Sequence, residues 1–91
     1  MKIVINKCFG GFSVNDNIVS MLNLRSRYDL EDDRTNARLI KIMEDGYFNV
    51  NDENSDLEIV EIPDEATDYM ITEYDGYENV LYVLDGKIKR V

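Results

Sequence analysis

The chain has 91 residues, of which 44% are hydrophobic and 32% are charged, and its formal net charge is −9. This composition excludes a disordered chain, which would be less apolar, and a membrane-spanning helix, which would need a run of roughly 18 to 20 apolar residues. We therefore expect one folded domain over residues 1–91.

The N-terminal segment, MKIVINKC, lacks the long apolar run and the small-residue cleavage site of a signal peptide. Cys8 is the only cysteine, so an internal disulfide is excluded, which fits a reducing compartment. We expect a cytoplasmic protein with no membrane association.

The first predicted element is a strand over residues 2–9, KIVINKCF. Apolar side chains occupy both of its faces, a pattern that is typical of a strand covered on both sides. We expect this strand to lie centrally in a sheet, with Cys8 as a buried thiol.

The glycines Gly10 and Gly11 end this strand. Ser13 and the aspartate three residues after it resemble a capping box, which predicts the start of a short helix. Phe9 and Phe12 are expected to pack on that helix, as residues of a hydrophobic staple do.

A second helix is predicted over residues 34–45, with Asp33 or Thr35 as its N-cap and Gly46 as its C-terminal stop. The polar segment that follows, residues 49–56, predicts a loop and is the one candidate for a mobile segment.

Strands are predicted over residues 57–63, 68–76 and 79–91, and the last of these contains an Asp-Gly pair between apolar runs, which indicates a hairpin. The predicted order is β-α-α-β-β-β(-β). The fold class is α+β, with one mostly antiparallel sheet of about four or five strands packed against two helices.

Three segments of the chain form a pattern together: MKIVINKCFGGFSV at the start, RTNARLIKIMEDG in the middle, and LEIVEIPDEATDYMITEYDGYE in the C-terminal half. This pattern resembles a family of short, uncharacterised phage and prophage proteins, on the segments CFGGF, IVEIPD and EYDG. The chain departs from that family in lacking tryptophans and a histidine-containing tail, and its middle is compressed. The resemblance implies a phage origin and a single compact fold, and it transfers no activity.

The negative charge is concentrated in one half of the chain. Residues 1–45 contain seven acidic and seven basic side chains, whereas residues 46–91 contain twelve acidic and three basic ones. Between Asp52 and Glu78 there are eleven carboxylates and no lysine or arginine. Direct nucleic-acid binding is therefore not expected, because it depends on cationic side chains.

This acidic segment favours a partner protein with a basic surface, which would be a host factor if the protein is phage-encoded. Tyrosines in the segment add rings of the kind that interfaces use, although half or more of them are expected to fill the sheet's core. The candidate partner-binding residues are Asp52, Glu53, Asp56, Glu58, Glu61, Asp64, Glu65, Asp68, Glu73, Asp75, Tyr77 and Glu78.

The glycine pair has neither the Walker nor the dinucleotide-binding spacing. A weaker alternative remains, in which backbone N–H groups of the turn bind an anion with Lys7 as the counter-charge. The candidate anion-site residues are Lys7, Gly10, Gly11 and Ser13. The competing interpretation gives the glycines a purely conformational role.

The chain has no histidine, the commonest general base and metal ligand, and no pair of carboxylates is singled out for catalysis. A calcium loop starting at Asp52 fails, because Leu57 occupies the required glycine position and Pro63 the bidentate acid position. We expect no enzyme activity, no cofactor and no metal site.

The favoured function is that of a small acidic phage-type accessory protein, a protein-binding module that inhibits a host protein through a nucleic-acid-mimicking face. The alternatives are a small-ligand or nucleotide-sequestering protein that uses the Gly10-Gly11 turn, and a structural or assembly component. The last of these leaves a homo-oligomer open.

Overall fold

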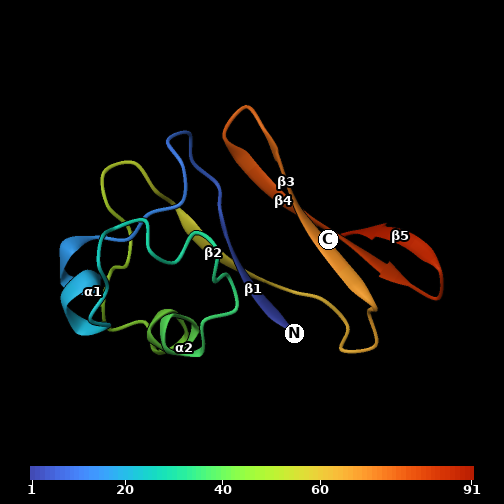
Figure 1. The fold of residues 1–91 in the computed structure, drawn as a ribbon, viewed down its shortest axis with the longest axis horizontal. Coiled ribbons are helices and arrows are strands. Elements are labelled where there is room, and N and C mark those ends of the chain that lie inside the picture. The colour runs from blue at the N-terminus through green and yellow to red at the C-terminus, as the bar shows by residue number, and fades with distance from the viewer.

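Two helices and five strands follow one another in the order β-α-α-β-β-β-β in the computed structural model, which describes residues 1–91 (Figure 1). The predicted α+β class and this element order are confirmed. The elements are β1 (Lys2–Asn6), α1 (Asp16–Met21), α2 (Ala37–Asp45), β2 (Leu57–Glu61), β3 (Asp68–Tyr74), β4 (Tyr77–Leu84) and β5 (Lys87–Arg90).

The strands form two sheets. In the first sheet β1 pairs antiparallel with β2, with Ile3 opposite Val60. In the second sheet β3, β4 and β5 pair antiparallel in that order, with Ile71 opposite Val80 and Val83 opposite Ile88. The prediction of a single sheet was therefore wrong.

The free edge of β1 explains why the two sheets do not join. On that edge the Val4 N–H donates to the carbonyl of Arg34 at 2.8 Å, and the Asn6 N–H donates to the carboxylate of Glu78 at 2.6 Å. These donors would otherwise pair with a third strand. Because they are satisfied by a loop carbonyl and a side chain, the β3–β4–β5 sheet packs over β1 instead of extending its sheet.

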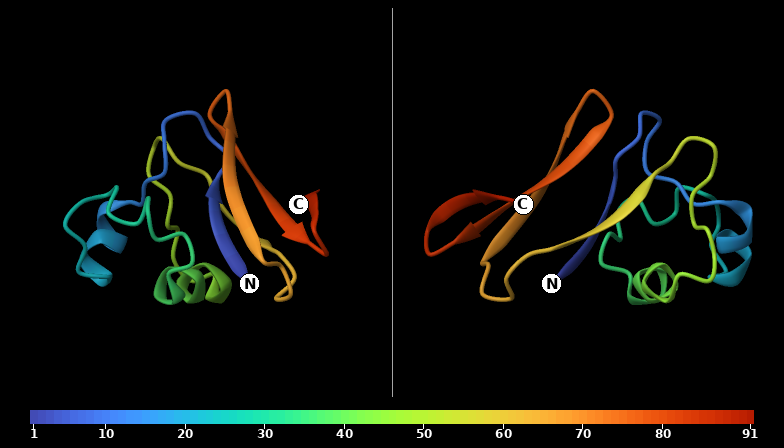
Figure 2. Two further views of the ribbon diagram at one scale, coloured as in Figure 1. Left: turned by 45° about the vertical axis from the view of Figure 1, so that its right-hand side comes forward. Right: turned by 180° about the vertical axis from the view of Figure 1, so that it is seen from behind.

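β1 is the middle layer of the molecule, between the helices and the second sheet (Figures 1 and 2). Its Val4 side chain enters a core with residues of both helices, while Ile3 and Ile5 point the other way and pack against Val80 of β4. The strand is thus buried on both faces, as its sequence predicts, with a different layer on each side. The prediction that it lies centrally in a sheet was wrong, because β1 pairs with β2 alone. The first core contains Val4, Phe12, Val14, Ile18, Leu22, Leu30, Leu39, Ile40, Val50 and Leu57.

Both helices begin later than predicted, because asparagines cap them. The Asn15 side chain accepts from the Ile18 N–H and begins α1, so Ser13 is not the cap. Asn36 does the same for α2, in place of the predicted Asp33 or Thr35. Gly46 ends α2 in a left-handed conformation, as predicted. Neither helix is long and apolar enough to cross a membrane.

Several predicted core side chains lie elsewhere. Phe12 is buried as expected, but Phe9 is exposed and does not pack on α1. Because β1 ends at Asn6, Cys8 lies in the bend after the strand and is only half-buried. None of the tyrosines of β3 and β4 is buried, so the prediction that half of them fill the core was wrong.

The polar segment 49–56 is anchored to the rest of the fold. The Asn15 amide donates to the carbonyls of Asn49 and Asn51, and the Asn51 side chain accepts from the Leu57 N–H. Val50 is buried in the first core. These contacts give the segment a defined position beside the glycine turn.

Candidate functional site

A buried ion pair joins the two sheets. The Arg34 guanidinium donates to both carboxylate oxygens of Glu78, from Nη1 to Oε1 at 2.7 Å and from Nη2 to Oε2 at 3.0 Å. The two side chains are only 10% and 11% exposed. The same Oε1 accepts the Asn6 N–H, so the buried charges are paired and hydrogen-bonded. This arrangement fixes β4 relative to β1.

Arg34 also contacts the loop before it and the segment after the glycine pair. Its Nε donates to the Glu31 carbonyl at 2.6 Å, and its guanidinium carbon lies 4.0 Å from the centre of the Phe12 ring, a cation–π distance. The three segments that carry the phage resemblance contain Phe12, Arg34 and Glu78. They therefore meet at a single side chain.

The buried Asn6 side chain shapes the glycine turn. Its Nδ2 donates to the carbonyl of Cys8 at 2.9 Å and to that of Gly11 at 2.7 Å, while its Oδ1 accepts from the Asp56 N–H at 2.8 Å. Gly10 has a φ of 136°, and a Cβ there would lie 3.0 Å from the Asn54 carbonyl oxygen. A glycine is required at this position both by backbone conformation and by close approach.

The turn between β3 and β4 packs against this glycine loop at one end of the molecule (Figures 1 and 2). Gly76 has a φ of 84°, and a Cβ on it would lie 2.6 Å from the Phe9 Cα. Tyr74 and Tyr77 are opposite each other across the turn, and both are exposed. We call this end of the molecule the tip, defined by Phe9, Tyr74, Asp75, Gly76 and Tyr77.

The predicted partner-binding residues are distributed between the interior and the surface. Glu78 is buried in the ion pair with Arg34, and the Asp52 side chain is 3% exposed, so neither carboxylate is presented to a partner. Tyr77 lies at the tip and is exposed. The other predicted carboxylates are exposed, namely Glu53, Asp56, Glu58, Glu61, Asp64, Glu65, Asp68, Glu73 and Asp75.

Bases from the first half of the chain neutralise part of the acidic segment. Arg27 lies 3.1 Å from a Glu53 carboxylate oxygen and 3.6 Å from one of Asp52. The N-terminal ammonium group lies 2.7 Å from the Asp64 carboxylate. The contrast between the two halves is therefore weaker in three dimensions than along the sequence.

Asp52 keeps its charge although it is enclosed. Burial by itself raises the pKa of this carboxyl, but the nearby Ser13 hydroxyl, hydrogen bonds from the Asn54 backbone and Ser55, and the charge of Arg27 bring the pKa below its usual range. The Ser13 hydroxyl is buried and acts on Asp52 through its dipole, because it makes no hydrogen bond within bonding geometry.

The candidate anion-site residues face different neighbours. The Lys7 ammonium group donates to the Asn79 side chain at 3.3 Å, and the Gly11 carbonyl accepts from Asn6. Ser13 lies beside the ionised Asp52, whose charge repels an anion at that position. This geometry argues against an anion site built from Lys7, Gly10, Gly11 and Ser13.

No group of three or more Asp, Glu or Cys side chains is arranged to hold a metal ion. Comparisons of the chain with protein-family models, with curated proteins and with solved structures found no match. The resemblance to short phage proteins therefore stays a prediction.

Asn6 and Arg34 organise the site, and neither was among the predicted site residues. A polar residue at an inward position of a strand that is otherwise apolar is a signal for a buried network, and Asn6 has that position in KIVIN. Arg34 gives no such signal, because it lies in a loop and its partner is 44 residues away.

Proposed function

We propose that the protein is a protein-binding module that docks its tip on a partner with a basic surface. The observation that carries this proposal is the exposure of three aromatic rings at one end of the fold: Phe9 is 74% exposed, Tyr74 83% and Tyr77 55%. Aromatic side chains are enriched at protein interfaces and supply much of their binding energy.

The support beneath the tip is fixed before a partner arrives. Phe9 and the turn at Gly76 are in direct contact, the Asn6 side chain bonds the glycine loop, and the Arg34–Glu78 pair anchors β4. A pre-organised surface loses little conformational entropy on binding. The rings are therefore suited to act as anchors.

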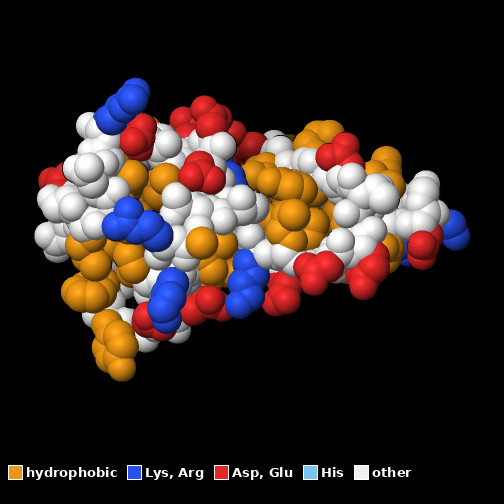
Figure 3. All heavy atoms as spheres, turned by 60° about the horizontal axis from the view of Figure 1, so that its bottom comes forward, with side chains coloured by type: hydrophobic (Ala, Val, Ile, Leu, Met, Phe, Trp, Pro, Cys, Tyr) orange, Lys and Arg blue, Asp and Glu red, His pale blue; other side chains and the backbone are white.

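The charges around the tip favour a basic partner. Asp56, Glu73 and Asp75 are exposed near this end, and the neighbouring Lys7 is held by Asn79. Figure 3, which shows the molecule from the side away from the tip, has further acidic side chains in a row along one edge of the elongated half, beside an apolar patch. Clustered carboxylates of one sign steer association with a surface of opposite sign.

A host protein that ordinarily binds nucleic acid is the partner class that we favour, since its basic surface suits a module with a net charge of −9 and exposed carboxylates near the tip. The module would then inhibit that protein by occupying the site of the phosphate backbone. Binding of the same surface to nucleic acid itself is disfavoured by like charge.

The test is quantitative affinity purification from the host, with mass spectrometry, using the wild-type chain, the variant Tyr74→Ala and the control Tyr47→Ala. Tyr47 follows α2 and is 86% exposed, so it matches Tyr74 in exposure without belonging to the tip. We expect a partner that the wild-type and control chains retain and that Tyr74→Ala loses at least about tenfold, because truncation of an anchor costs about 2 kcal/mol or more.

The purified partner should bind the module more weakly as the salt concentration rises, and oligonucleotides should compete for it. Equal recovery with all three chains would refute the role of the tip. If recovery depends on the tip but is insensitive to salt and oligonucleotides, the protein-binding role is supported and nucleic-acid mimicry is refuted.

A further inference from the structure

We propose that two copies of this chain associate through the outer face of the β3–β4–β5 sheet, which is the face turned away from β1 and β2. The outer face continues toward Tyr74 and Tyr77 of the tip, but the residues substituted in its test, Met70 and Ile88, do not belong to the tip. Variants at these two positions therefore test the inference separately from the proposed function.

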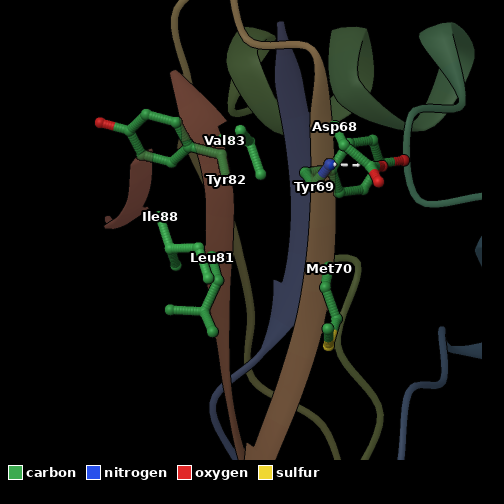
Figure 4. A pocket seen from close by; sticks show the side chains of 7 residues that line it. All are labelled: Asp68, Tyr69, Met70, Leu81, Tyr82, Val83 and Ile88. Carbon is green, nitrogen blue, oxygen red and sulfur yellow. Dashed lines mark hydrogen bonds between the residues drawn. The ribbon is translucent and has the colours of Figure 1, made fainter. Parts of the chain in front are cut away.

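The outer face is apolar and slightly hollow. Alternation along the paired strands places Met70, Leu81, Val83 and Ile88 on this side, opposite to Val80 and Glu78. Met70 is 59% exposed and Ile88 75%. The hollow has a volume of about 100 Å³ and is lined by Asp68, Tyr69, Met70, Leu81, Tyr82, Val83 and Ile88 (Figure 4).

The sequence of β4 indicates that this face is meant to be covered. Residues 80–84, VLYVL, are apolar at successive positions, which is typical of a strand buried on both sides. On the inner side Val80 is buried against Ile3 and Ile5. On the outer side Leu81 and Val83 belong to neither core and are only half-buried, so the single chain does not supply the second layer that the pattern predicts.

β5 gives an independent indication of missing contacts. None of its four residues is buried, and the strand projects from the rest of the molecule (Figure 1). The accessible surface of the chain is 5975 Å². A monomer of this mass, 10.6 kDa, has an accessible surface of roughly 5500 Å². The chain therefore exposes about 500 Å² more than an average monomer of its mass, in keeping with the projecting strand.

The charges on the outer face suit a second copy better than the proposed basic partner. Although the chain carries a net charge of −9, this face has one acid, Asp68 on β3, and one base, Arg90 on β5. A two-fold axis parallel to the strands and in front of β4 lays β3 of each copy over β5 of the other. Asp68 pairs with Val83 and Arg90 with Leu81, so in this arrangement Asp68 of one copy is offset from Arg90 of the other by two residues, about 7 Å along the strand.

The size of the face predicts a weak dimer. The hollow on this face is lined by seven residues, far fewer than the roughly 20 to 30 residues that each partner contributes to an interface of standard size. We therefore expect a dissociation constant on the order of 10 to 100 μM, which makes dimerisation sensitive to concentration.

Sedimentation equilibrium of the full chain tests the proposal, at concentrations from about 1 μM to about 1 mM, which bracket the expected dissociation constant. We expect a monomer–dimer equilibrium. The variants Ile88→Lys and Met70→Lys should raise the dissociation constant at least tenfold. Each lysine makes the net charge less negative, so weaker association cannot result from greater repulsion between copies.

Tyr47→Lys is the matched control, because it makes the same charge change at an exposed aromatic residue outside the outer face, and it should leave the dissociation constant unchanged. Far-ultraviolet circular dichroism and thermal melting show whether each variant is folded, and two independent lysine variants guard against the failure of one. A chain that stays monomeric throughout, an assembly larger than a dimer, or a dimer that both lysine variants leave intact would overturn the proposal.

Discussion

Replacing Gly76 with alanine should destabilise the fold much more than the same replacement at Gly86. Both glycines are the second residue of an Asp-Gly hairpin turn, with φ values of 84° and 75°. An alanine at either position costs about 1 to 2 kcal/mol for the left-handed conformation. The cost of the left-handed backbone conformation is therefore the same at both sites, and only the atoms around each site differ.

The surroundings of Gly76 set the additional cost. A Cβ there would lie 2.6 Å from the Cα of Phe9 and 2.9 Å from its Cβ, whereas nothing lies within 4 Å of the corresponding position at Gly86. Carbon atoms pack favourably at about 3.5 to 4.0 Å, so the turn and the glycine loop must separate by about 1 Å. Overpacking of this kind costs about 1 to 3 kcal/mol beyond the backbone term.

Thermal unfolding, followed by circular dichroism, measures the difference. For a domain of this size, about 1 to 3 kcal/mol corresponds to a melting temperature roughly 5 to 20 °C lower for Gly76→Ala than for Gly86→Ala. Urea titration of the two variants gives the same comparison as free energies of unfolding. Equal losses of stability would refute the claim that the turn and the glycine loop are in close contact.

Three further predictions concern stability. Arg34→Met leaves a buried carboxylate without its cation, so it should lower the free energy of unfolding, measured by urea titration, by about 3 to 5 kcal/mol. The double variant Arg34→Met, Glu78→Gln should recover much of that loss. If the effects of the two substitutions simply add, the two side chains do not interact as described. Asn15→Ala should lower the melting temperature more than Asn36→Ala. Each asparagine caps a helix, which contributes about 1 kcal/mol, but only Asn15 also anchors the loop before β2. The reverse ranking would argue against that anchoring. The pKa of Asp52 is lower in the folded chain than in the unfolded chain, so its charge contributes stability above the unfolded pKa of about 3.9, and this contribution is lost as the pH falls through the folded pKa. The wild-type chain should therefore lose more stability than Asp52→Asn between about pH 5 and about pH 2. Parallel plots of unfolding free energy against pH for the two chains would contradict this prediction.

The sequence predicted the elements better than their assembly. Local signals, such as the apolar run in β1 and the Asp-Gly pair between β4 and β5, identify strands and turns because the physics that produces them acts over a few residues. The observed boundaries differ from the predicted ones where two nearby residues could cap the same helix; Asn15 caps α1, whereas Ser13 was predicted to do so.

The division into two sheets was not predictable from these signals. It depends on which groups satisfy the free edge of β1, and one of them, the Glu78 carboxylate, is 72 residues from Asn6 in sequence. The candidate site has the same limitation. Charge and composition singled out the acidic segment, but whether a given carboxylate is buried or presented depends on contacts such as that between Arg27 and Asp52.

The tip is composed of Phe9 from the start of the chain and residues 74–77 from near its end. During synthesis, Phe9 leaves the ribosome long before the turn that packs against it, and only the finished chain brings the two together. A truncated or partly synthesised copy thus lacks the assembled rings. The partner binding that we propose for the tip would therefore be restricted to chains that contain both segments.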